Sequence, residues 1–94
     1  MNNKKYELTN DAIEVNGKTL YRIKALKRIN YVDPGDLGGY IQSEANLSHE
    51  GDCWIFDNAK VFDNALVCDD AMVFDSVHIS GDIIIGRDAI ILSE

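Results

Sequence analysis

The residues best suited to acid–base chemistry in this chain are its two histidines, His49 and His78. Histidine changes its charge near neutral pH, which suits it to act as a general base. Such a base needs a nucleophile or another polar group placed to work with it, and the sequence shows no complete set of this kind. We therefore predict that the protein is not an enzyme and that it uses no cofactor.

The two cysteines, Cys53 and Cys68, are the other candidates for chemistry. They form no C-x-x-C pair and are too few for a disulfide scaffold, which is typical of a reducing compartment. No apolar run reaches the length of a membrane span, and the start MNNKKYELTN lacks the apolar core of a signal peptide. These features predict a cytoplasmic protein without membrane attachment.

Length and net charge limit the classes of function. The chain has 94 residues, enough for one small domain, and its 46% hydrophobic content is typical of a folded protein. A formal net charge of −7 makes direct binding to nucleic acid or to anionic membranes unfavourable. The same charge favours a protein partner with a basic surface.

Charge is divided unevenly along the chain. Residues 1–35 hold seven basic and four acidic residues, whereas residues 36–94 hold two basic and twelve acidic ones. Within the first part, Asn16-Gly17 stands between alternating apolar runs, which is the sequence of a two-residue β-hairpin turn. We therefore predict an N-terminal β-hairpin cap over residues 1–35 and a second part over residues 36–94.

A six-residue repeat fills the second part, as GDCWIF, DNAKVF, DNALVC, DDAMVF, DSVHIS, GDIIIG and RDAIIL over residues 51–92. Each hexad has a β-branched aliphatic residue and, two positions earlier, a small or apolar one. A separation of two places both side chains on one face of a strand, and the Asp, Asn, Gly and Ser residues between strands favour tight turns. We predict that both positions face inward: Ile55, Val61, Val67, Val73, Ile79, Ile85 and Ile91, with Cys53, Ala59, Ala65, Ala71, Val77, Ile83 and Ala89.

This period resembles the hexapeptide-repeat family. The resemblance implies an all-β fold, a short left-handed parallel β-helix of about three coils with three hexads in each. It covers residues 51–92 strongly and extends weakly upstream, with a slip of two residues at His49 and Glu50. The family's usual glycine after the aliphatic residue appears only as Gly86, which makes the outer surface unusual.

The upstream segment is similar to phage and prophage hexapeptide-like proteins, which carry an L-Y-R-I-K-A-L arm, a G-D-L-G-G-Y-I block and N-A-x-V runs. No assigned activity comes with this resemblance. The wider hexapeptide family includes acyltransferases, and that likeness implies an alternative in which His49 or His78 is the base beside a pantetheine groove. Its zinc enzymes use three histidine ligands, which two histidines do not supply.

One face of the predicted coils is apolar. Residues eighteen apart would stack, and on this face large side chains point outward. Soluble monomers seldom expose such a patch, so either the hairpin or a second subunit must cover it. We predict self-association as a dimer or trimer through this face or through the open end, with the oligomer interface formed by Trp54, Phe56, Met72, Phe74, Ile90 and Leu92.

Carboxylates occupy the corners between strands, where they could bind a basic partner surface or could serve only the geometry of the turns. Asp52, Asp70 and Asp88 are eighteen residues apart and would stack in a line along one corner, where they could attract a calcium ion. One such line supplies too few oxygen ligands for calcium, so we predict no metal site. The predicted acidic binding surface is Asp52, Asp57, Asp63, Asp69, Asp70, Asp75 and Asp88.

The leading functional hypothesis is a non-enzymatic, self-associating acidic protein that binds a protein partner. The phage resemblance adds a specific version, an inhibitor of a host-defence nucleoprotein complex of the CRISPR type, because ordered carboxylates can occupy a site built for phosphates. The alternatives are the acyltransferase and a structural scaffold module that binds only itself.

Overall fold

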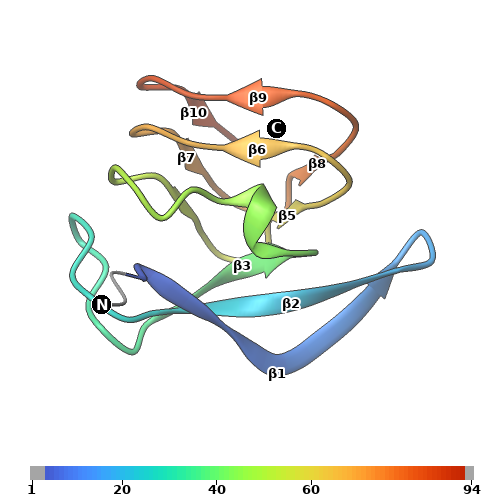
Figure 1. Cartoon of the computed structure of the whole chain (residues 1–94), viewed down its shortest axis with the longest axis horizontal. Helices are drawn as coiled ribbons and strands as arrows, with labels where there is room; N and C mark the ends of the chain where they lie inside the picture. The colour runs from blue at the N-terminus through green and yellow to red at the C-terminus, as the bar shows by residue number, and fades with distance from the viewer. Residues whose placement is uncertain (1–3, 93–94) are drawn as a thin grey trace.

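The computed structural model describes residues 4–92 and contains short β-strands joined by tight turns (Figure 1). Three longer strands come first, followed by one turn of 3-10 helix, η1, and seven strands of two residues. The strands are β1 (Tyr6–Val15), β2 (Lys18–Ala25), β3 (Leu37–Ile41), β4 (Trp54–Ile55), β5 (Lys60–Val61), β6 (Leu66–Val67), β7 (Met72–Val73), β8 (His78–Ile79), β9 (Ile84–Ile85) and β10 (Ile90–Ile91), and η1 is Glu44–Asn46.

Strands β1 and β2 form an antiparallel hairpin. Asn16 and Gly17 join them with φ angles of 53° and 79°, the left-handed conformation that a type I′ turn requires. In Figure 1 the hairpin crosses below the stacked short strands. It therefore closes the lower end of the molecule.

The remaining strands stack in parallel. Strand β2 pairs antiparallel with β3, which then pairs in parallel with β5, and β5 pairs with β8, giving a mixed five-stranded sheet. Strands β4, β7 and β10 form a second sheet and β6 and β9 a third, both parallel. Paired residues within residues 51–92 are eighteen apart, as Trp54 is from Met72. We call residues 51–92 the parallel stack. Its first rung is β4, its middle rung consists of β5, β6 and β7, and its last rung consists of β8, β9 and β10.

The predicted left-handed parallel β-helix is wrong. The first sheet is mixed, because β1, β2 and β3 are antiparallel, and the strands of residues 4–92 do not close into a solenoid. The reason lies upstream of the repeat, where long hairpin strands continue into β3. The chain then leaves the six-residue period at η1, which Ser43 caps at its N-terminus.

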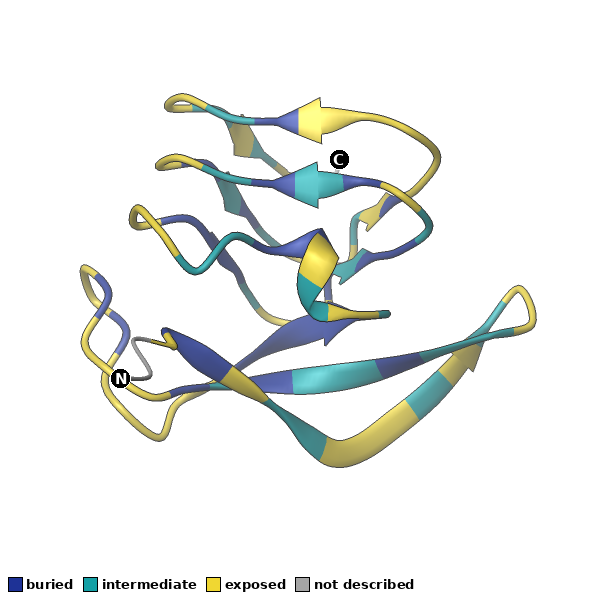
Figure 2. Ribbon diagram, in the orientation of Figure 1, coloured by how far each residue is buried: buried dark blue, intermediate teal, exposed yellow. Residues whose placement is uncertain are grey.

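The larger of two buried hydrophobic clusters joins the hairpin to the parallel stack (Figure 2). Tyr6 and Ile23 from the hairpin belong to the same buried cluster as Ile55, Val61 and Val73 from the stack. This cluster crosses the predicted boundary at residues 35 and 36. The inward small positions Cys53, Ala59, Ala65 and Ala71 are fully buried.

Close backbone approach explains a glycine in β3. A Cβ atom on Gly39 would lie 2.4 Å from the carbonyl oxygen of Ala59. Real Cβ contacts are essentially never this short, so only glycine fits between β3 and the backbone just before β5. Gly39 is therefore a strand position at which β3 and the parallel stack come close together.

Candidate functional site

The corner aspartates of the parallel stack have a structural role. Asp57, Asp63 and Asp69 have φ angles of 58°, 60° and 59°, in the left-handed region that aspartate tolerates better than most residues. Each carboxylate accepts the backbone N–H of the residue eighteen positions later, at distances of 3.1, 3.2 and 2.8 Å. The aspartate at one corner thus fixes the corner of the next rung, with the N–H donated by Asp75, Gly81 and Arg87.

A second file of carboxylates runs beside the first. Asp52, Asp70 and Asp88 are exposed, and a carboxylate oxygen of Asp70 accepts the N–H of Asp52 at 3.2 Å. Among residues 4–92 no group of three or more His, Cys, Asp or Glu side chains is arranged to hold a metal ion. The file is therefore a line of negative charge along one corner.

Few cations neutralise these carboxylates. Lys18 contacts Asp63 at 2.8 Å and lowers the pKa of that carboxyl, and the N–H of Gly81 acts in the same direction. Arg87 meets Asp69 through its backbone N–H, not through its guanidinium group. Within the described residues, the other predicted binding residues form no ion pair: Asp52, Asp57, Asp69, Asp70, Asp75 and Asp88.

Charges in the hairpin half are paired instead. Arg22 contacts Asp11 at 3.3 Å, and Lys24 contacts Glu7 at 3.1 Å. Arg22 also donates to the carbonyl oxygen of Gly38 at 2.7 Å and lies over the ring of Tyr40. The hairpin therefore satisfies much of its own charge, whereas the corners of the parallel stack do not.

Both ring nitrogens of His49 have protein partners. Nδ1 accepts the backbone N–H of Lys5 at 3.1 Å, and Nε2 lies 2.7 Å from a carboxylate oxygen of Glu44. The ring stacks on Tyr6 with the centroids 4.1 Å apart. With both nitrogens engaged and one face covered, His49 holds the turn after η1 against β1 and has no free nitrogen to offer a substrate.

His78 is exposed on β8, where its ring meets Phe62 edge to face with the centroids 6.4 Å apart. It lies on the last rung, whereas His49 lies beside the hairpin. The fold therefore does not bring the two candidate bases into one site.

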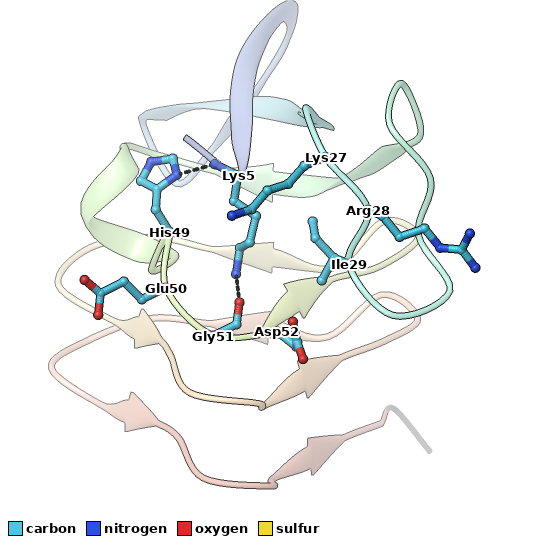
Figure 3. Close-up of a pocket in the computed structure, with 8 residues that line it drawn as sticks. All are labelled: Lys5, Lys27, Arg28, Ile29, His49, Glu50, Gly51 and Asp52. Carbon is cyan, nitrogen blue, oxygen red and sulfur yellow. Dashed lines mark hydrogen bonds between the residues drawn. The ribbon is translucent and has the colours of Figure 1, made fainter. Parts of the chain in front are cut away.

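A cavity of about 620 Å³ lies beside His49 at the hairpin end of the parallel stack, which is uppermost in Figure 3. Its walls mix cations and carboxylates, and in Figure 3 Arg28 points away from the other lining side chains. The fully buried Lys5 ammonium group turns into the protein, donating to the carbonyl oxygens of Gly51 at 3.2 Å and Cys53 at 2.8 Å. Lys5 therefore braces the start of the parallel stack, a role that nothing in its sequence position indicates.

Both cysteines are free thiols. Burial raises the pKa of Cys53, which lies in the core beside the Lys5 ammonium group at 3.2 Å. Burial and the neighbouring Asp69 carboxylate also raise the pKa of Cys68. Neither environment favours a reactive thiolate.

The predicted apolar face is not uniform. Trp54 is 1% exposed and its ring lies 6.3 Å from that of Tyr6, so the hairpin half covers it. Phe56 and Phe74 stack on each other with the centroids 4.5 Å apart. Met72 is half-buried, whereas Ile90 and Leu92, on the last rung, are 62% and 60% exposed.

The sequence did not predict that Ile83 and Ile84 are exposed at the open end of the parallel stack. Ile83 is 49% exposed, although its position in the repeat was expected to face inward, and Ile84 is 68% exposed. A signal was present, because GDIIIG has isoleucine where most hexads have alanine.

No known protein-family model matches this sequence, and no curated protein matches it either. Among the described residues, no helix is long and apolar enough to cross a membrane. Functional inference therefore depends on the corners, the last rung and their charges.

Proposed function

We propose that this is a non-enzymatic, self-associating acidic protein of the cytoplasm that binds a protein partner through the corner carboxylates of the parallel stack. The observation that carries the proposal is the fixing of Asp57, Asp63 and Asp69 by backbone N–H groups of the next rung. A carboxylate held in place loses little side-chain entropy when it binds, so its charge is available at low cost.

Spacing supports a partner that normally binds phosphates. Neighbouring parallel strands are about 4.8 Å apart, so Asp52, Asp70 and Asp88 form a line of closely spaced negative charges, as the phosphates of a nucleic acid strand do. A basic protein surface relieves the mutual repulsion of such a line. A protein with net charge −7 is a poor ligand for nucleic acid itself but a good competitor for its binding site.

The partner class that fits best is a nucleoprotein complex with a basic channel. The similarity of the upstream segment to phage and prophage proteins favours a phage-encoded inhibitor of a host-defence complex of the CRISPR type. His49 does not favour the acyltransferase alternative, because both its ring nitrogens are occupied.

The test measures DNA binding by purified CRISPR-type effector complexes at increasing concentrations of this protein. The decisive variant changes Asp57, Asp63, Asp69 and Asp75 together to Asn, which tolerates the left-handed corner and keeps an oxygen to accept the N–H. We expect inhibition by the wild type and at least about a tenfold loss in the variant, since charged contacts at rims and channels are each worth about 1 kcal/mol or less.

The matched control changes Glu7, Asp11, Glu14 and Asp33 to their amides, which removes the same number of charges from the hairpin half. We expect this control to inhibit nearly as well as the wild type. Equal inhibition by both variants, or no inhibition of any complex by the wild type, contradicts the proposal.

A further inference from the structure

The last rung of the parallel stack leaves three strand edges open. Strands β8, β9 and β10 are each the outermost strand of their sheet, and no other strand of residues 4–92 pairs with their outer edges. An open strand edge with apolar neighbours is a template for pairing with another chain.

The backbone of β9 has donors directed at this open edge. In the rung below, Leu66 and Cys68 donate their N–H groups upward, to the carbonyl oxygens of Ile83 at 3.0 Å and Ile85 at 2.9 Å. Ile84 and Gly86 stand eighteen residues after these donors in the same register. Their N–H groups therefore point away from β6, toward the open edge.

The core is also uncovered at this end. Ala65 is fully buried in the middle rung, whereas Ile83, at the same repeat position, is 49% exposed. Ile84 is 68% exposed on the outer face of β9. The end of the parallel stack thus combines unpaired donors with exposed apolar side chains.

We propose that two copies of this protein dock end to end through antiparallel pairing of β9 with β9 of the second copy, on a two-fold axis at Ile84. In this register Ile84 lies opposite its own counterpart, and Gly86 lies opposite Asp82 of the other copy. The backbone N–H groups of Ile84 and Gly86 are directed at the partner, as antiparallel pairing requires. The inference rests on the self-association in the proposed function and names its surface.

Charge complementarity favours β9 over β8. Asp82 precedes β9 and Arg87 follows it. With Ile84 opposite its counterpart, each Arg87 lies opposite Gly81 of the other copy, the residue next to Asp82. Both residues are exposed, and Arg87 forms no ion pair within residues 4–92. Strand β8 lies between Asp75 and Asp82, so the same pairing there would bring like charges together.

The corner residues of the last rung favour an antiparallel partner over a further parallel rung. Asp63 and Asp69 cap the rung above them, but the equivalent positions of the last rung are Gly81 and Arg87, which offer no side-chain acceptor. A further parallel rung would lack these two caps. Antiparallel pairing through β9 needs no such side-chain cap, because its hydrogen bonds join backbone groups.

Cross-linking tests the position of the axis. In a Cys68→Ser background, Ile84→Cys and Ile90→Cys each place one exposed thiol on the last rung, and a short bis-maleimide reports whether two equivalent thiols are close. We expect a covalent dimer with Ile84→Cys only, because Ile90 lies in another sheet, off the two-fold axis. Efficient linkage of Ile90→Cys with none of Ile84→Cys overturns the proposed register.

Sedimentation equilibrium measures how much the charges of Arg87 and Asp82 contribute to the affinity of the dimer. Arg87→Asp and Asp82→Arg each bring like charges together, and we expect each to weaken the dimer by about tenfold. The double variant restores the opposite pair and is expected to recover most of the wild-type affinity. Asp is compatible with the φ angle of 56° at position 87, so folding is retained.

The outcomes separate this surface from self-association in general. A wild-type dimer that survives both charge reversals, but is dissociated by Phe74→Glu, places the interface on the apolar face and overturns the β9 proposal alone. A trimer overturns it as well, because two-fold pairing closes at two copies. A wild type that is monomeric at every concentration contradicts self-association itself.

Discussion

The two ends of the parallel stack carry equivalent residues in different surroundings. Trp54, Met72 and Ile90 occupy one repeat position on three successive rungs, yet their exposure rises from 1% for Trp54 to 62% for Ile90. The hairpin half covers the first, whereas no strand of the described residues covers the last. The repeat therefore sets where a side chain points, and the neighbouring segment sets whether it is buried.

The same two ends differ in electrostatics. At the lower end Glu44 contacts Lys4 and His49, and Lys5 is buried with its ammonium group hydrogen-bonded. At the upper end the exposed Asp82 and Arg87 form no ion pair within residues 4–92. One end is thus completed inside the molecule, and the other has the features of a binding surface.

The largest expected contrast is between Trp54 and Ile90. We expect Trp54→Ala to lower the free energy of unfolding by about 4 kcal/mol, because it leaves a cavity under the hairpin. Ile90→Ala should cost less than about 0.5 kcal/mol, since it removes exposed atoms. Urea denaturation at high dilution, where any dimer dissociates, measures both.

A milder substitution at Trp54 tests the same comparison in a variant that is expected to fold. A loss of about 4 kcal/mol is a large share of the stability of a small domain, so Trp54→Phe provides a milder step in the same direction. Similar losses at Trp54 and Ile90 would mean that the two ends are equally covered and would remove the contrast.

The second contrast concerns a corner. Asp69→Ala removes the acceptor for the N–H of Arg87 and places alanine at a φ angle of 59°, so we expect a loss of about 2 kcal/mol. Asp69→Asn keeps both the acceptor and the tolerated conformation, and we expect a change within about 0.5 kcal/mol. Thermal and urea unfolding of the two variants give the comparison.

An equal loss in both Asp69 variants would show that the charge itself stabilises the corner. That result would contradict the interpretation of the corner aspartates as caps whose charges are available to a partner. A gain in stability for Asn would instead show that repulsion between the carboxylates opposes folding.

The sequence was most informative where the six-residue period is unbroken. Ala59, Ala65 and Val67 are buried as their positions indicate, because alternation along a short strand leaves little freedom in side-chain direction. The period could not show that β2 and β3 pair antiparallel, since strand order depends on contacts between distant segments. The fold inferred from the family resemblance was wrong for that reason.

The candidate site was less predictable than the strands. The positions of the corner aspartates were visible, but their hydrogen bonds to the next rung depend on a left-handed φ angle that sequence alone leaves open. Lys5 had no signal at all, because a lysine near a chain start is normally exposed. Its burial follows only from the carbonyl oxygens of Gly51 and Cys53, which the fold brings to it.

The smallest expected contrast is a pH dependence confined to the lower end. Lys4 first, and His49 second, lower the pKa of Glu44 below its ordinary value. A carboxyl with a lowered pKa in the folded state stabilises the protein above its ordinary pKa of about 4.3, and this contribution is lost as the pH falls through the lower value. Glu44→Gln should therefore cost less than about 1 kcal/mol near neutral pH, because the group is partly exposed.

The difference between wild type and Glu44→Gln should shrink as the pH falls below the ordinary glutamate pKa of about 4.3 and disappear as the pH passes through the lowered pKa of Glu44 in the folded state. Urea unfolding at a series of pH values measures it. Glu50 lies in the same segment without an ion pair among the described residues, so Glu50→Gln serves as the control and should show little difference at any pH. A difference for Glu44→Gln that persists at low pH would assign the role of Glu44 to packing and not to its charge, and the lower end would then be held to the hairpin by its core and by the hydrogen bonds of Lys5.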